Sequence, residues 1–343
     1  MLELKTILVP TDFSDFSLQA IPVAWELARE HGAEIVLGHA CPYDCDLDVA
    51  RRKLEEIGRR LAPLPYRTRI AVASPVEFLY DLAASLDRAL MIVTTHAWRG
   101  TDRQLLGSVT ERVISRIPCA ILTIKSQRTM VRELEKPPEP LPDLAEVRGP
   151  ELRQVPKSPD DFFFEKLDRK LVAASRAAAL KKQEARHGRQ THIVELRSLL
   201  VPVDFSRRAE EAVVVGVALA RHYGARLVLL HVLEEHSGGR GRPQREARRL
   251  EVARAQLEAL RDRMVPVPCE CLVDGGSAAA VIVDQAERQD VDLVVMGSRG
   301  RRTVVGIPLG STARVVVRRA DRPVLILKGP KATELVRTPP TSS

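Results

Sequence analysis

The chain has 343 residues, which gives room for two domains of ordinary size and a connector. Its 45% hydrophobic and 29% charged residues are typical of a soluble globular protein, and no run of about 18 apolar residues exists that could cross a bilayer. The net charge of +8 is diffuse and comes with only 4% aromatic residues, which disfavours nucleic acid as a partner. Without a signal-peptide pattern or a cysteine framework, we expect a cytoplasmic protein with reduced thiols.

An internal repeat divides the chain. The segment Ile7–Ser14, ILVPTDFS, aligns with Leu199–Ser206, LLVPVDFS, at an offset of 192 residues. Near the ends of the two copies the offset becomes 203, where Leu106–Ser108 aligns with Leu309–Ser311. A duplication of this kind predicts two similar domains. We expect domains at 1–126 and 197–329, a linker over 127–196 and a disordered tail over 330–343.

Each copy alternates between short apolar runs and amphipathic segments. The predicted strands of the second copy, in chain order, are 198–203, 226–232, 269–273, 292–296 and 324–327. The predicted helices between them are 209–223, 246–264, 278–288 and 311–319. This order predicts two tandem α/β domains, each a doubly wound, Rossmann-like parallel sheet of five strands with helices on both faces. Such sheets bind ligands beyond the carboxyl ends of their strands.

Asp204 follows the first strand of the second copy, as Asp12 does in the first. A carboxylate at this place can accept hydrogen bonds from an exocyclic amine or a ribose hydroxyl. Asp-Phe-Ser before a helix is also a capping arrangement, in which the side-chain oxygens bind the first amides of the helix. The residues alone leave both interpretations open.

A glycine motif follows the fourth strand of the second copy. Gly297-Ser-Arg-Gly300 is separated by nine residues from Gly310-Ser-Thr, which opens the last helix. Glycine permits positive φ and a close approach of backbone amides to a ligand, and a helix start attracts anions, so the motif suits phosphate. Arg299, Ser311 and Thr312 would contact the anion, although the hydroxyls can cap the helix, the arginine can face solvent and the glycines can simply turn the chain.

Together these motifs resemble the universal stress protein family, whose ATP-binding members carry Gly, two residues, Gly, nine residues and Gly-Ser or Gly-Thr. The resemblance extends over both repeats and implies ATP, with Mg²⁺ as a candidate companion. It places Asp204 and the backbone of Val232 at adenine, and Gly276 or its neighbour Gly275 near the ribose. It places the phosphates at the remaining motif residues, Gly297, Gly300, Gly310 and Ser311.

The first copy departs from this pattern. Thr94 and Ala97 stand at the first two glycine positions, and Ala73 replaces the glycine after the third strand. Because each added side chain blocks close approach or disfavours positive φ, we expect weak or absent nucleotide binding there. In the family, paired domains join through their last strands, so the resemblance implies that Ala120–Ile124 pairs with Val324–Leu327 within this chain.

Other clusters of reactive side chains do not lead to an assigned site. His39, Cys41, Cys45 and His96 follow strands of the first copy and offer zinc-type ligands, but their spacing matches no common zinc pattern, so we assign no metal. Cys269 and Cys271 alternate along a strand and should face one side as inert buried thiols. Cys119 has the same structural interpretation.

The linker over 127–196 differs from the two repeats in composition. Residues 137–159 hold seven prolines, which predicts an extended segment. A basic helix with a narrow apolar seam is expected over residues 162–182. It would either pack on its own domains or contact a second copy or another protein.

For function, the sequence favours an ATP-binding regulator or interaction module in which nucleotide occupancy changes shape or partners. No Walker lysine motif and no obvious base for water are present, so we assign no catalytic residue. Two alternatives stay open. One is a slow ATPase or nucleotidyl transferase in which Arg299, Ser311 and a metal ion place the phosphates, and the other is an interaction scaffold without nucleotide.

Overall fold

A computed structural model of the chain describes residues 3–41, 46–95, 108–125, 196–234, 243–264, 267–300 and 309–328, together with Leu335. The expected helix over 162–182 and the rest of the linker before Leu196 lie outside the described residues, as does the tail apart from Leu335. Both repeats belong to one compact unit. Within the described part of the chain, none of the helices has the length and apolar character needed to cross a bilayer.

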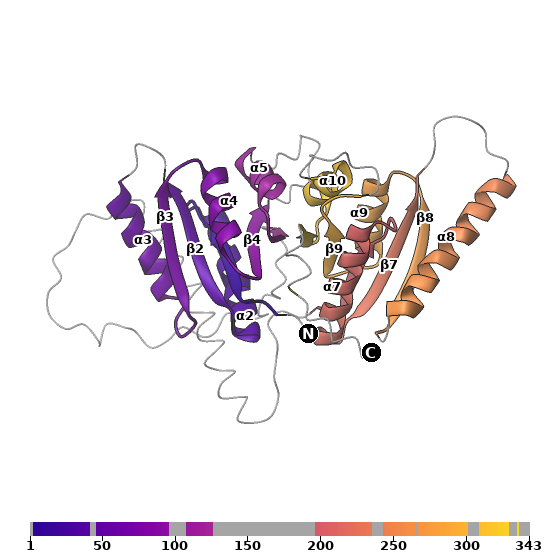
Figure 1. Cartoon of the computed structure of the whole chain (residues 1–343), viewed down its shortest axis with the longest axis horizontal. Helices are drawn as coiled ribbons and strands as arrows, with labels where there is room; N and C mark the ends of the chain where they lie inside the picture. Colours follow the sequence, from indigo (N-terminus) through magenta and orange to yellow (C-terminus); the bar gives the residue numbers. More distant parts are fainter. Residues whose placement is uncertain are drawn as a thin grey trace, which may run out of the picture. The chain divides into compact units, whose positions relative to one another are not determined.

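The first repeat, domain 1, alternates strands and helices as expected (Figure 1). Its strands are β1 (Thr6–Pro10), β2 (Glu34–Cys41), β3 (Tyr66–Val72), β4 (Ala89–Thr95) and β5 (Ala120–Lys125). Its helices are α1 (Asp15–Leu18), α2 (Ala20–His31), α3 (Leu47–Arg59), α4 (Pro75–Ser85) and α5 (Ser108–Arg116).

The second repeat, domain 2, has the same alternation. Its strands are β6 (Ser198–Pro202), β7 (Arg226–Leu233), β8 (Cys269–Gly275), β9 (Leu293–Gly297) and β10 (Val324–Leu327). Its helices are α7 (Arg207–Tyr223), α8 (Pro243–Met264), α9 (Ala278–Arg288) and α10 (Ser311–Arg319).

Local sequence signals mark the start of the first helix after β1 and β6 and the end of the first long helix in each domain. Ser206 accepts a hydrogen bond from the amide of Ala209 at the start of α7, and Ser14 accepts one from the amide of Ser17 at the start of α1. Both α2 and α7 end at a glycine in the left-handed conformation, Gly32 with φ 66° and Gly224 with φ 67°. The repeated caps explain why the repeated sequence gives the same local structure twice.

The ten strands form one sheet in the order β3-β2-β1-β4-β5-β10-β9-β6-β7-β8. Among the described strands, the pairs within a domain are parallel, and the pair that joins the domains, β5 with β10, is antiparallel. The predicted fold class is therefore confirmed. In each domain the winding reverses beside the first strand, at β1 with β4 and at β6 with β9, which is where ligands of such sheets bind.

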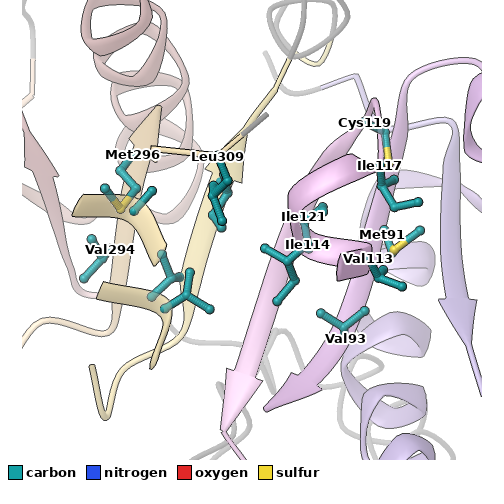
Figure 2. Packing of buried hydrophobic residues seen from close by; sticks show 14 of the residues in the cluster. Met91, Val93, Val113, Ile114, Ile117, Cys119, Ile121, Val294, Met296 and Leu309 are labelled. Carbon is teal, nitrogen blue, oxygen red and sulfur yellow. The ribbon is translucent and has the colours of Figure 1, made fainter. Parts of the chain in front are cut away.

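The junction confirms the expected pairing of the last strands. Leu122 lies opposite Leu325 and Ile121 opposite Ile326. Buried side chains of β4, α5 and β5, and of β9 with Leu309, belong to a single hydrophobic cluster that runs through both domains (Figure 2). The two domains thus share one core as well as one sheet.

Two buried lysines cross this junction in matching ways. The ammonium group of Lys125 donates to the carbonyl of Val317 at 2.7 Å, and Lys328 donates to the carbonyl of Ile114. At the offset of 203, Lys125 aligns with Lys328 and Ile114 aligns with Val317. Each domain therefore makes the same contact with the other. Burial lowers the pKa of Lys125 to about 8 and that of Lys328 to about 7.

Candidate functional site

The turn after β6 fixes the position of Asp204. Its Oδ1 atom accepts hydrogen bonds from the Ser206 hydroxyl at 2.6 Å and the Ser206 amide at 3.1 Å. Phe205 adopts a φ of 58°, and its ring lies 4.6 Å from the ring of His231. Nδ1 of His231 in β7 donates to the carbonyl of Val203 at 2.7 Å, and this hydrogen bond helps to fix the turn. The capping interpretation of Asp-Phe-Ser is thereby confirmed, with one carboxylate oxygen used in the turn.

The glycine motif after β9 lies directly against this turn. A Cβ atom on Gly300 would lie 2.6 Å from Oδ2 of Asp204, closer than a Cβ atom approaches a non-bonded atom. A Cβ atom on Gly297 would lie 3.0 Å from Cβ of Arg208 and 3.1 Å from its carbonyl oxygen, in the first turn of α7. Both glycines therefore allow the chain after β9 to approach the start of α7. Because β6 and β9 are paired in parallel, their carboxyl ends bring these segments to the same edge of the sheet.

Glycine at 297, 300 and 310 was expected to permit a positive φ, but none of these three residues adopts one. Among the described glycines, positive φ occurs at Gly32, Gly224 and Gly276, and Gly310 has φ −65° and ψ 155° as the N-cap of α10. Close approach, rather than a left-handed backbone, is the physical reason for glycine at 297 and 300.

Backbone hydrogen bonds tie the two parts of the motif together. The amide of Gly310 donates to the carbonyl of Ser298 at 2.8 Å, and the amide of Ser298 donates to Leu327 in β10 at 3.0 Å. Gly310 is the N-cap of α10, so the cap residue itself supplies no side-chain hydrogen bond. Ser311 is exposed, and Thr312 and Arg299 are half-buried. Residues 301–308, the middle of the predicted phosphate loop, lie outside the described residues.

The other two predicted contacts lie at the ends of β7 and β8. Val232 is half-buried in β7 and lies opposite Asp274 of β8. Gly276 follows β8 with a φ of 132°, and its amide donates to the carbonyl of Leu233 at 3.1 Å. The parallel strands β6 to β9 therefore bring all the predicted contacts of domain 2 to one edge of the sheet, and Asp204 with Gly300 is the pair in direct contact.

Domain 1 has the same turn after β1, but other residues at the carboxyl ends of its strands differ from those of domain 2. Phe13 has a φ of 65°, and Nδ1 of His39 donates to the carbonyl of Thr11 at 2.8 Å. Burial raises the pKa of Asp12, but hydrogen bonds from Ser14 and Ser17 outweigh it, and the pKa lies below its usual 3.8.

The substitutions in domain 1 alter the backbone as well as the side chains. Ala73, aligned with Gly276, does not adopt positive φ, so the chain leaves β3 differently from β8. Thr94, aligned with Gly297, is buried, and its hydroxyl oxygen has no hydrogen-bond partner. Ala97 lies outside the described residues.

Of the four residues considered as zinc ligands, His39 and Cys41 are described by the structure, and both have other roles. His39 is 8% exposed and uses Nδ1 for the turn, a structural role that the sequence analysis missed although the paired His39 and His231 signalled it. Cys41 is disulfide-bonded, which corrects the expectation of reduced thiols and removes it as a thiolate ligand. Cys45 and His96 lie outside the described residues.

Of the other described cysteines, none is disulfide-bonded. Cys119 is buried, as expected, whereas Cys269 and Cys271 are only half-buried. Burial raises the pKa of Cys269 to about 12 and raises that of Cys271 as well. Both thiols therefore stay protonated near neutral pH and are poor nucleophiles, in line with the prediction of inert groups.

The edge of domain 2 carries groups that are suited to binding a ligand. A carboxylate, a close glycine loop and the start of a nine-residue helix offer acceptors for a base or sugar and a positive partial charge for an anion. Of the described residues at this edge, His231 is committed to a backbone carbonyl, and Asp204 binds Ser206 through one oxygen.

Comparisons with known proteins agree with this architecture. A universal stress protein of Thermus aquaticus is 34% identical over 139 residues, covering 38% of this chain and 98% of that protein. The crystal structure of a universal stress protein from Archaeoglobus fulgidus DSM 4304 shares the fold, with a TM-score of 0.58 and 17% identity over 94% of this chain and 98% of that chain. A further universal stress protein, solved in complex with cAMP, covers 39% of this chain and 97% of its own at 23% identity, with a TM-score of 0.32.

The model of the universal stress protein family matches the chain twice, at residues 3–125 and 195–328. These two segments contain the two five-stranded domains described above. The chain therefore belongs to the universal stress protein family and carries two of its domains in tandem.

Proposed function

We propose that domain 2 binds ATP at the carboxyl edge of its sheet and that the chain acts as a nucleotide-dependent regulator or interaction module. The contact of Gly300 with Asp204 is the observation that carries this proposal. It joins a carboxylate suited to adenine or ribose to a loop suited to phosphate, and it leaves no room for a side chain at residue 300. The start of α10, with Gly310 as N-cap, adds the helix dipole.

The other assigned contacts follow from their places at this edge. Val232 would contact the base through its backbone, and Gly276 would lie near the ribose. Arg299, Ser311 and Thr312 would contact the phosphates, with Mg²⁺ as their counter-ion. Domain 1, with Ala73 and Thr94 at its glycine positions, would serve as the structural partner.

The first test exchanges one atom of the carboxylate in each domain. Asp204→Asn keeps an oxygen to accept from Ser206 but replaces the second acceptor with a donor. We expect at least a tenfold loss of ATP affinity, measured by isothermal titration, which corresponds to about 1.4 kcal/mol. Asp12→Asn makes the same change in the matching turn of domain 1 and should leave ATP affinity unchanged. Equal effects of the two variants would contradict the assignment to domain 2.

The second test fills the space at the glycine loop. Gly300→Val places a branched side chain against the Asp204 carboxylate, where even a Cβ atom would lie at 2.6 Å. ATP affinity should fall at least tenfold, whereas Ala97→Val at the aligned position of domain 1 should have little effect. Thermal unfolding of each variant separates a lost site from a lost fold.

The fate of the nucleotide separates the regulator from its alternatives. Heat extraction of the purified chain should release ATP, and phosphate release with added ATP and Mg²⁺ should be slow compared with nucleotide dissociation. Sustained phosphate release that is lost in Asp204→Asn would favour a slow ATPase. Absence of any adenine nucleotide binding would favour a scaffold.

A further inference from the structure

The last turns of α2 and α7 meet across the two domains. Nε2 of His222 lies 2.7 Å from Oε1 of Glu30, and the hydroxyl of Tyr223 donates to Oε2 of Glu30 at 2.9 Å. The rings of His31 and His222 lie 5.0 Å apart at an interplanar angle of 34°. Glu30 aligns with His222 and His31 with Tyr223 at the offset of 192, so equivalent positions of the two repeats face each other.

This cluster has the donor set of a transition-metal site. One oxygen of Glu30 and one ring nitrogen each of His31 and His222 all lie within 4.8 Å of one another. Ligands bound to zinc at about 2.0–2.2 Å in a tetrahedral arrangement lie roughly 3.3–3.6 Å apart. The three donor atoms therefore need only small side-chain adjustments to share one ion. Two imidazoles and one carboxylate leave a fourth position for water, as in open zinc sites.

One ring nitrogen of His31 lacks a hydrogen-bond partner. Nε2 of His31 is shielded from solvent and has no hydrogen bond. Burying a polar atom without a partner destabilises the folded state, and such an atom in a native structure requires an explanation. A metal ion bound by His31 and His222 would supply the missing partner. Tyr223 would keep its hydrogen bond to the second oxygen of Glu30 and so orient the carboxylate, as outer groups do around metal ligands.

The cluster also borders a cavity. His31, Gly32 and Glu34 line a cavity of about 780 Å³ at the amino ends of the domain 1 strands. A hydrated ion could reach the imidazole of His31 from this side. His222 lies near the end of α7, and the turn that carries Asp204 precedes the start of this helix. Because α7 begins beside that turn and has 17 residues, the cluster lies about 25 Å from the candidate nucleotide edge.

We propose that Glu30, His31 and His222 bind a divalent transition-metal ion of the zinc class, which ties α2 of domain 1 to α7 of domain 2. An ionised carboxylate only accepts, so Nε2 of His222 carries the proton in its contact with Glu30. Metal binding at Nε2 displaces this proton, and the neutral ring then carries its one proton at Nδ1. The ion then bridges two helices of different domains and should resist their separation.

The test uses the full chain, stripped of metal with a chelator and kept free of nucleotide, because ATP itself binds Zn²⁺. Zn²⁺ is titrated in competition with a chromophoric chelator, and Co²⁺ is added as a spectroscopic probe. We expect one Zn²⁺ per chain, a tetrahedral Co²⁺ spectrum without thiolate charge transfer, and a higher unfolding temperature with metal.

Variants decide whether the cluster is the site. His31→Ala and His222→Ala should each lower Zn²⁺ affinity at least tenfold and abolish the metal-dependent rise in unfolding temperature. Arg221→Ala, at an exposed position beside His222, should change neither measurement. Cys269→Ser/Cys271→Ser removes the described pair of neighbouring free thiols and should also bind Zn²⁺ as the wild type does.

Three results would overturn the proposal. They are Zn²⁺ binding that survives both histidine changes, Zn²⁺ binding that disappears with the two cysteines, and no binding by the wild type at micromolar Zn²⁺. If a histidine variant fails to fold, the Co²⁺ spectrum of the wild type alone still distinguishes nitrogen and oxygen ligands from thiolates.

Discussion

Neighbouring glycines at the end of β8 have different physical roles. Gly276 has a φ of 132°, which residues other than glycine rarely adopt. A Cβ atom there would also lie 3.3 Å from Cγ2 of Val281. Gly275 has open space within 4 Å and no positive φ. The aligned residue of domain 1, Ala73, avoids positive φ altogether, so this conformation belongs to domain 2.

We therefore predict that Gly276→Ala destabilises the chain by about 1–3 kcal/mol, whereas Gly275→Ala changes stability by much less. The free energy of unfolding in urea measures both. If Gly276 also lies near the ribose, its substitution should weaken ATP binding as well. Equal losses of stability in the two variants would show that the backbone conformation at residue 276 is not the constraint.

A second residue-scale prediction concerns the histidine that holds the Asp204 turn. His231→Ala removes the hydrogen bond to the Val203 carbonyl and the ring that packs on Phe205. We expect a loss of about 1–3 kcal/mol in stability, together with weaker ATP binding because the turn loosens.

His39→Ala is the matched control, since His39 makes the same two contacts with Thr11 and Phe13. It should lower stability in a similar way and leave ATP affinity intact. A loss of ATP affinity in His39→Ala alone would indicate that the nucleotide binds to domain 1 instead.

At the scale of elements, the helix starts of domain 2 differ in how they are capped. Ser206 accepts from the amide of Ala209 at the start of α7, whereas Ser277 at the start of α9 makes no side-chain cap bond. Ser206→Ala should therefore cost about 0.5–2 kcal/mol, and Ser277→Ala should cost little. Urea unfolding of the two variants checks this, and comparable losses would mean that the cap bond of Ser206 does not stabilise α7.

The repeated signals at element ends explain why the fold could be predicted from the sequence. Apolar runs, serine caps and glycine C-caps recur at fixed offsets, and each is a local property of a few neighbouring residues. The reason for glycine at 297 and 300 could not be read in this way, because it depends on Arg208 and Asp204, almost a hundred residues earlier in the chain. Spacing indicated the motif, but the packing of β9 beside β6 supplied its cause.

The contact between the ends of α2 and α7 could not be predicted from the sequence for a related reason. The cluster of Glu30, His31 and His222 forms because an antiparallel junction places equivalent helix ends face to face. A single sequence has no local pattern that reports such a meeting. The disulfide at Cys41 was missed because cysteine number and cellular compartment, rather than geometry, guided the expectation.

At the scale of the whole molecule, the junction between the domains contains two lysines that are almost completely buried. Lys125 is 1% exposed and Lys328 is 4% exposed, and each donates to a carbonyl near the end of the other domain's last helix. Carbonyls at a helix end carry a partial negative charge, which partly offsets the cost of burying an ammonium group. Glu111 of α5 adds ion pairs to Arg314 and Arg318 of α10 across the same junction.

The two lysines should make the stability of the chain depend on pH. Burial lowers their pKa values to about 8 and about 7, from 10.5 in an exposed lysine, so between about pH 7 and 10 the unfolded chain binds more protons than the folded one. The destabilisation is full below the folded pKa and fades as pH rises, by up to about 1.4 kcal/mol per pH unit for each proton.

Urea unfolding at intervals from pH 7 to 9.5 should thus show stability rising with pH. The rise should flatten in Lys125→Met/Lys328→Met and persist in Lys5→Met, which changes a lysine whose side chain is 57% exposed. An unchanged slope in the double variant would mean that the buried lysines hold their protons throughout this range.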